Sequence, residues 1–164
     1  MSNKILLDSS ILIEYIKGTK TELLDQLMLN DFELQYNSIV ASEFIFHFLA
    51  QAGNKSPLAL KEGNAIGSVL RKSNSPNDFL SQFNYLNIQE PEIKFSIELM
   101  SEFNLLSNDS LIIANAFNNG ISYIATYDPD FCSPCKKFNI EVISSIRHIM
   151  AKWMTLAFLQ NQFV

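Results

Sequence analysis

The 164-residue sequence lacks any long uninterrupted apolar run, although 48% of its residues are hydrophobic. Each apolar stretch is broken well before the ~20 residues that a membrane-spanning helix needs, so we expect no membrane span. The N-terminal segment also lacks the basic and then apolar order of a secretory signal, because Asp8 falls where the apolar core would lie. Both absences favour a cytoplasmic protein.

Cysteine is scarce as well, and the two cysteines form one C-x-x-C pair, Cys132 and Cys135. A tetrahedral zinc site needs four ligands, but the chain has no second cysteine pair, and His47 and His148 lie far away in sequence. A thioredoxin-like pair should open a helix directly after a strand, whereas this pair follows a turn. We interpret both residues as ordinary loop thiols, with metal binding between subunits as the alternative.

Basic residues are few, because 12 Lys and Arg stand against 17 Asp and Glu, which gives a formal net charge of −5. This balance argues against a broadly basic surface for nucleic acids. It does not exclude an acidic site that takes its positive charge from a metal ion. A few cations could contact phosphates, although each is more often part of a solvated surface: Lys17, Lys20, Arg71, Lys72, Lys136 and Lys137.

The sequence does contain a regular alternation of short apolar runs and longer helical patterns. Its length suffices for one packed core, so we expect a single domain over residues 1–164. We predict strands at 4–7, 32–37, 83–88, 122–126 and 140–143. We predict helices over 9–18, 20–29, 38–53, 57–72, 90–105, 109–118 and 144–162, the last within a C-terminal helical extension, 144–164.

Strands that alternate with helices of this length are typical of a parallel sheet covered on both faces. We therefore predict an α/β fold, a three-layer α/β/α sandwich with a mainly parallel central sheet. Right-handed crossovers place the carboxyl ends of the parallel strands along one edge, where open α/β sheets bind their ligands.

Acidic residues should gather near that edge. Asp8 ends the first strand, Asp128 follows the apolar run 121–125, and Asp109 begins a helix. Glu43 lies among phenylalanines and isoleucine, where an unpaired charge is costly. Each acid alone has an ordinary explanation as a helix cap, a turn residue, a helix-dipole partner or a solvent-facing side chain. Those explanations predict no common location, whereas the fold argument places three of the four at one edge.

Several carboxylates in one place raise one another's pKa, so the cluster is unfavourable as bare anions. A hard divalent cation resolves this, because Mg²⁺ and Mn²⁺ prefer oxygen ligands and are usually held by carboxylates together with substrate phosphates. Such ions can activate water and stabilise the leaving oxygen of a phosphodiester. His47 lies one helical turn beyond Glu43 and could meet that carboxylate or the substrate, although a surface histidine is the simpler explanation.

At these residues the sequence resembles the PIN domain family of metal-dependent nucleases, which includes the VapC-type toxins of toxin–antitoxin pairs. Four segments carry the resemblance in the family's order, and each holds one acid of the set: LLDSSILIEYIKG, NSIVASEF, NDSLIIANAFNNG and TYDPDF. The resemblance, in order, spacing and local structure, covers about residues 4–143. The length of 54–90, the C-terminal tail and the CSPCKKF segment depart from the common pattern.

The resemblance implies that four acids are catalytic and hold Mg²⁺ or Mn²⁺: Asp8, Glu43, Asp109 and Asp128. It adds Asp130 as a possible further metal ligand, and Ser9, Ser10 and Thr126 as residues that orient ligands or water. It implies an endoribonuclease that hydrolyses RNA with a metal-activated water, forms a homodimer and is silenced by a cognate antitoxin protein. The alternative is a catalytically silent PIN-like module that binds RNA or protein, against which the four repelling carboxylates argue.

Overall fold

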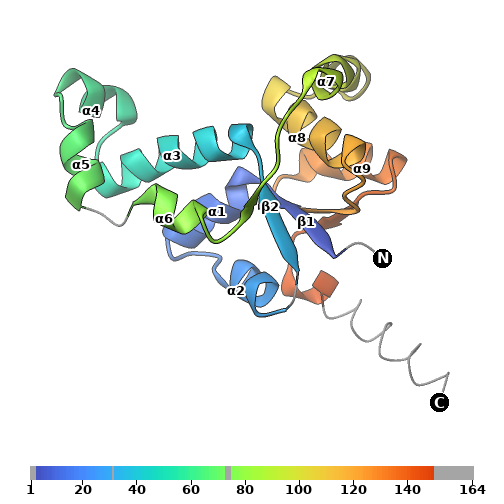
Figure 1. The fold of residues 1–164 in the computed structure, drawn as a ribbon, viewed down its shortest axis with the longest axis horizontal. Coiled ribbons are helices and arrows are strands. Elements are labelled where there is room, and N and C mark those ends of the chain that lie inside the picture. Colours follow the sequence, from blue (N-terminus) through green and yellow to red (C-terminus); the bar gives the residue numbers. More distant parts are fainter. Residues whose placement is uncertain (1–2, 31, 73–74, 150–164) are drawn as a thin grey trace.

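The computed structural model describes residues 3–30, 32–72 and 75–149, and its centre is a five-stranded sheet (Figure 1). Neighbouring strands are parallel throughout, and their order is β3-β2-β1-β4-β5. The strands are β1 (Lys4–Leu7), β2 (Glu33–Tyr36), β3 (Asn84–Tyr85), β4 (Tyr123–Ala125) and β5 (Glu141–Ile143). The predicted parallel sheet is therefore confirmed.

The central strand β1 is apolar because helices cover it on both sides. Its Ile5, Leu6 and Leu7 have no exposed surface, which is the continuous apolar pattern of a buried parallel strand. Strand β4 pairs with it in register, with Ile5 opposite Tyr123 and Leu7 opposite Ala125. The two strands therefore end side by side at one edge of the sheet.

The chain moves outward from β1 to β3 and then crosses to β4, on the other side of β1. Right-handed crossovers in opposite directions place helices on opposite faces, as Figure 1 shows. On one face lie α1 (Ser9–Ile16), α2 (Glu22–Leu29), α3 (Ser38–Gly53), α4 (Pro57–Glu62), α5 (Ile66–Lys72) and α6 (Pro76–Leu80). On the other lie α7 (Glu90–Phe103), α8 (Ser107–Asn118) and α9 (Cys132–Lys137), with the short 3₁₀ helix η1 (Pro129–Phe131) before α9. This is the predicted three-layer sandwich.

The structure differs from the predicted elements between β2 and β3. The helix predicted over 57–72 is two helices, because Asn64 adopts a left-handed φ of 50° just after Gly63 ends α4. Helix α6 lies between the predicted helix 57–72 and the predicted strand 83–88, where we predicted no element; Ser75 caps it and Pro76 fits its first turn. The strand predicted at 83–88 shortens to the two residues of β3.

The C-terminal prediction is only partly covered by the described residues. Backbone at 146–149 is helical, while most of the predicted helix 144–162 lies outside the described residues. The helical extension and the single-domain organisation therefore stay predictions. None of the helices within the described ranges is long and apolar enough to cross a membrane.

The two cysteines lie in α9, and not in a loop as predicted. Cys132 is exposed, whereas Cys135 is completely buried. Both are free thiols, and burial raises the pKa of the Cys135 thiol to about 12. A thiol with so high a pKa stays protonated and is a poor nucleophile or metal ligand.

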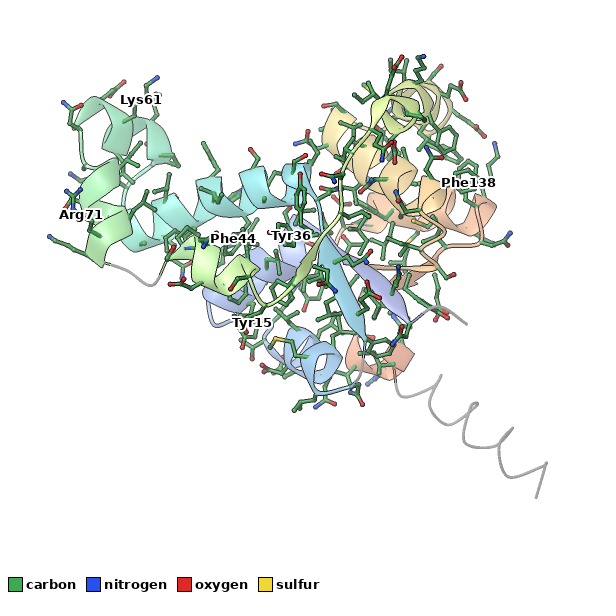
Figure 2. The ribbon with its side chains drawn as sticks, viewed as in Figure 1. Tyr15, Tyr36, Phe44, Lys61, Arg71 and Phe138 are labelled. Atoms are coloured by element: carbon green, nitrogen blue, oxygen red, sulfur yellow. The ribbon has the colours of Figure 1, made fainter. Side chains whose placement is uncertain are left out.

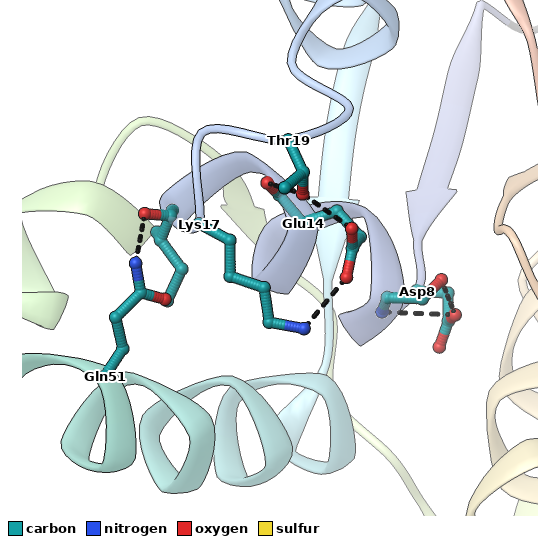
Figure 3. A network of polar contacts seen from close by, with 7 residues as sticks. Asp8, Glu14, Lys17, Thr19 and Gln51 are labelled. Atoms are coloured by element: carbon teal, nitrogen blue, oxygen red, sulfur yellow. Dashed lines mark hydrogen bonds and ion pairs between the residues drawn. The ribbon is translucent and has the colours of Figure 1, made fainter. Parts of the chain in front are cut away.

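Helices α1 and α3 pack against each other and are joined near their C-terminal ends. Gln51 Nε2 donates a hydrogen bond to the Ile16 carbonyl at 2.8 Å (Figure 3). In the same view, Lys17 Nζ and Thr19 Oγ1 donate to the Glu14 carboxylate at 2.9 and 2.6 Å, which secures the end of α1. The Gln51–Ile16 hydrogen bond thus adds to the packing that holds the two helices together.

A buried pair of asparagines links α3 to α8. Asn37 Oδ1 accepts hydrogen bonds from the backbone N–H groups of Ile39 and Val40 at 3.1 Å and so caps α3. Its Nδ2 donates to Asn115 Oδ1 at 3.1 Å, and Asn115 Nδ2 donates to the Asn87 carbonyl at 2.9 Å. Both asparagine side chains are fully buried. Because α3 and α8 each carry one predicted acid, this link sets the spacing of the site.

We expect Asn115→Ala to lower the free energy of unfolding by about 1–3 kcal/mol, because it leaves the buried Nδ2 of Asn37 without its partner. Urea denaturation followed by circular dichroism measures this. The matched control is Asn118→Ala, an exposed position on the same helix, which should change stability little. Equal free energies of unfolding for the two variants would show that the Asn37–Asn115 link does not stabilise the fold.

Candidate active site

A cleft of about 360 Å³ lies where β1 and β4 end, beside the point at which the strand order reverses. This is the usual place for a ligand in an open α/β sheet. The four predicted acids all line it: Asp8, Glu43, Asp109 and Asp128. The structure therefore brings together residues from four separate segments of the chain.

Asp8 directly follows β1 and is only 4% exposed. Its N–H donates to the Ala125 carbonyl at 2.9 Å, which ties it to the end of β4. Its Oδ2 accepts hydrogen bonds from Ser10 Oγ at 2.5 Å and Thr126 Oγ1 at 2.8 Å. Burial raises the pKa of Asp8, and these hydrogen bonds oppose the rise. Asp8 also caps α1. It is therefore both a helix cap and a member of the acidic cluster.

The hydroxyl groups of Ser10 and Thr126 connect the ends of the two central strands. Ser10 Oγ accepts a hydrogen bond from the Tyr127 N–H at 3.1 Å while it donates to Asp8. Thr126 Oγ1 accepts from the Asp128 N–H at 2.9 Å while it too donates to Asp8. Each hydroxyl thus holds the Asp8 carboxylate and the turn that carries Asp128 in one arrangement.

Glu43 has a polar partner on each carboxylate oxygen. Ser9 Oγ donates to Oε2 and Asn108 Nδ2 donates to Oε1, both at 2.6 Å. The next residue, Phe44, is completely buried, so α3 is anchored in the core beside the half-buried acid. Asn108 was missed by sequence reasoning. Its only signal was its place directly before Asp109, and its contact depends on how α8 packs against α3.

Asp109 is the third residue of α8, which begins two residues earlier than predicted, and its side chain is half-buried. Burial, followed by the negative charges of Asp128, Asp8, Glu43 and Asp130, raises the pKa of Asp109 to about 6. The cluster is therefore electrostatically unfavourable as it stands, as the sequence argument expected.

Asp128 caps η1, because its Oδ1 accepts a hydrogen bond from the Asp130 N–H at 2.9 Å. Asp128 is therefore both a turn residue and a member of the acidic cluster, as Asp8 is both a cap and a member. Asp130 is exposed and lies outside the cleft lining, although its charge still acts on Asp109. Thr126 also lies outside the lining, buried behind Asp8.

Carboxylates dominate the described lining of the cleft. Of the described residues that line it, none is Lys or Arg. Its donors are carboxylates and hydroxyls, apart from the imidazole of His47. Within the described ranges, no three His, Cys, Asp or Glu side chains approach closely enough to enclose a metal ion in their present positions.

Several candidate phosphate contacts are engaged elsewhere. Lys17 pairs with Glu14 at 2.9 Å, and Lys20 Nζ lies 4.5 Å from the centre of the Tyr127 ring. Figure 2 shows Arg71 on α5, at the end of the molecule away from the sheet. These cations are therefore poorly placed to neutralise the cleft.

We expect the contribution of Asp109 to the stability of the metal-free protein to fall as the pH rises from about 4 to about 7. The pKa of Asp109 is about 6 in the folded chain against an ordinary 3.8, so the folded state binds this proton more tightly. That contribution is complete below the lower pKa and is lost as the pH passes the upper one. Asp109→Asn should have a higher melting temperature than the wild type above the upper pKa.

Melting temperatures in EDTA across this range measure the effect. Glu98→Gln, which removes an exposed carboxylate from α7, is the matched control and should follow the wild-type curve. An Asp109→Asn curve that also follows the wild type would contradict the electrostatic description of the cleft.

Comparison with known proteins places this architecture in a family. The sequence model of the PIN domain matches residues 5–137. The chain is 30% identical over 139 residues to Ribonuclease VapC6 of Methanocaldococcus jannaschii, covering 79% of this chain and 91% of that protein. It is 29% identical over 131 residues to Ribonuclease VapC2 of the same organism, covering 79% and 87%.

Solved structures share the fold. The crystal structure of PAE2754 from Pyrobaculum aerophilum matches with a TM-score of 0.58 and 16% identity, over 93% of this chain and 99% of that one. A toxin–antitoxin complex from Klebsiella pneumoniae matches with a TM-score of 0.56 and 20% identity, over 85% and 96%. Since the PIN domain model spans most of the sequence and the parallel sheet with its flanking helices agrees, the chain belongs to the PIN domain family.

Proposed function

We propose that this chain is a metal-dependent endoribonuclease that hydrolyses RNA phosphodiester bonds at the acidic cleft. The observation that carries the proposal is the convergence of four carboxylates on one cleft whose described lining contains no Lys or Arg. The names of its relatives, Ribonuclease VapC6 and Ribonuclease VapC2, support RNA as the substrate.

The donor set of the cleft fits a hard divalent cation, because carboxylate and hydroxyl oxygens are the ligands that Mg²⁺ and Mn²⁺ prefer. When bound, such a cation activates water and offsets the charge that develops at the phosphodiester. We assign its binding to Asp8, Glu43, Asp109 and Asp128, with Asp130 as a further candidate.

The chain's own residues orient these carboxylates. Ser10 and Thr126 hold Asp8 Oδ2 through two hydroxyl groups. Ser9 and Asn108 hold the two oxygens of Glu43. Hydrogen bonds of this kind fix the direction of a ligand before the cation and substrate arrive, which lowers the cost of ordering the site.

A PIN-like module that binds RNA or protein without cleavage is the alternative. Such a module has no need of four carboxylates that destabilise one another, and their charges add to burial in raising the pKa of Asp109. The two functions differ in what the loss of one carboxylate does. It would abolish turnover in a nuclease and leave RNA binding intact in a module.

Incubating a mixed RNA pool with the wild type and with Asp109→Asn tests the proposal, in Mn²⁺ or Mg²⁺ and in EDTA. We expect wild-type cleavage that EDTA abolishes and that Asp109→Asn lowers by at least roughly 100-fold, since even residues behind a metal ligand contribute about 10- to 100-fold. Mn²⁺ should also raise the melting temperature of the wild type more than that of the variant.

Glu98→Gln again serves as the control, and should cleave like the wild type because its carboxylate is exposed on α7, away from the cleft lining. Cleavage that persists in EDTA, or that Asp109→Asn retains, would contradict the catalytic assignment. If the wild type does not cleave RNA and its melting temperature does not depend on the metal, the catalytic proposal fails and the binding module remains.

We further propose that the chain is the toxin of a type II toxin–antitoxin pair, acts in the cytoplasm as a homodimer, and is silenced by a cognate antitoxin. The relatives named VapC and the toxin–antitoxin complex with the same fold support this. Expression of the chain should slow growth of a bacterial host, and Asp109→Asn should relieve the effect because it removes cleavage.

Co-expression with the product of the adjacent gene should restore growth, and the two proteins should co-purify. Sedimentation of the purified chain measures whether it is a dimer. Normal growth with an active wild type, together with no association with the neighbouring product, would overturn the toxin proposal and leave the nuclease proposal standing.

A further inference from the structure

An exposed aromatic side chain lies at the acidic cleft. Phe46 lines the same cleft as the four carboxylates, yet 56% of its surface is exposed. Single exposed apolar residues are common on protein surfaces, so exposure alone assigns no role. The position of Phe46 is informative, because a phenyl ring in a polar cleft gains little from its neighbours and remains available to a ligand.

Helix geometry directs Phe46 toward the site. It follows Glu43 by three residues on α3, and residues so spaced lie on one side of a helix. Phe44, between them, is completely buried and anchors α3 in the core. Its ring stacks on that of Phe79, with the ring centres 5.2 Å apart. The backbone that presents Phe46 is therefore fixed, whereas its ring faces solvent beside Glu43.

His47 braces this ring. The imidazole and phenyl rings are in edge-to-face contact, with centres 5.7 Å apart and planes inclined by 79°. Such pairs are favourable arrangements of aromatic rings. His47 is itself exposed and also lines the cleft. The pair thus presents an oriented aromatic surface next to the carboxylates.

The charge of the cleft makes such a surface useful to a nuclease. RNA is a polyanion, and proteins usually bind it through Lys and Arg, but none of the described residues lining this cleft is either. Stacking of a base on an aromatic ring needs no charge and is a common mode of single-strand recognition. One stacked base contributes roughly 5- to 150-fold in affinity.

We propose that Phe46, braced by His47, is the platform on which one base of a single-stranded RNA substrate stacks beside the cleavage site. This rests on the proposed nuclease function and extends it to the form of the substrate. A paired base is already stacked within its duplex, so the platform favours single strands over double strands. Phe46 acts in substrate binding, and the four carboxylates in cleavage.

The test compares Phe46→Ala, Phe46→Leu and Phe46→Trp in the full chain, with a single-stranded RNA that the wild type cleaves. We expect the Ala and Leu variants to raise KM by roughly ten-fold or more and to change kcat less, since stacking acts on binding. Phe46→Trp should keep the wild-type KM because it retains an aromatic face. Leu29→Ala, at an apolar position that is 75% exposed on α2, is the control and should have no effect.

A second measurement separates stacking from a structural role. A series of this RNA with one abasic nucleotide at each position is titrated against Asp109→Asn, which keeps the RNA intact. Loss of the base at one position should weaken binding to Asp109→Asn. In the double variant Asp109→Asn/Phe46→Ala, loss of that base should no longer affect binding. A dependence that persists would overturn the proposal.

The outcomes distinguish this proposal from the nuclease proposal. Cleavage by Phe46→Ala with an unchanged KM would overturn the stacking platform and leave the nuclease intact. If the same variant loses only self-association in sedimentation, Phe46 serves a protein contact, and stacking is again overturned. If the wild type neither cleaves nor binds RNA, both proposals fail together.

Discussion

Four carboxylates share one cleft and repel one another, and the rest of the site depends on holding them there. At Asp109, burial is the larger cause that raises the pKa to about 6, and the negative charges of the neighbouring acids add to it. The fold supplies two of the acids from the ends of parallel strands, namely Asp8 after β1 and Asp128 after β4. Helices α3 and α8 supply Glu43 and Asp109. Such a cluster costs stability, which is the pattern expected where a site serves a function, as we propose for this cleft.

Two sets of hydrogen bonds hold the acids in place against this repulsion, one at the cleft and one buried between α3 and α8. Near the cleft, the hydroxyls of Ser10 and Thr126 hold Asp8 and join the ends of the two central strands. Deeper in the fold, Asn37 and Asn115 link the start of α3 to α8 through a fully buried hydrogen bond. Both sets of hydrogen bonds lie close to β1, whose apolar residues are buried in the core at the centre of the sheet.

Much of the fold and part of the site could be predicted from the sequence. The apolar runs predicted the parallel sheet, and with it the common edge for Asp8 and Asp128, since both follow strands. The place of Glu43 in the cleft needed the family resemblance, because no local pattern shows how α3 packs on α8. Asn108 was missed for the same reason, as it meets Glu43 across 65 positions of sequence. The break in the helix at 57–72 depended on a left-handed residue after Gly63, which a helical pattern does not reveal.

We propose that these carboxylates bind one or more divalent cations in one place. The most direct measurement is the anomalous difference density of manganese in crystals of the full chain grown with Mn²⁺. We expect a strong peak within the cleft, bounded by Asp8, Glu43, Asp109 and Asp128, whose side chains shift toward it from their metal-free positions. Mn²⁺ bound only elsewhere, or an empty cleft in crystals saturated with Mn²⁺, would contradict it.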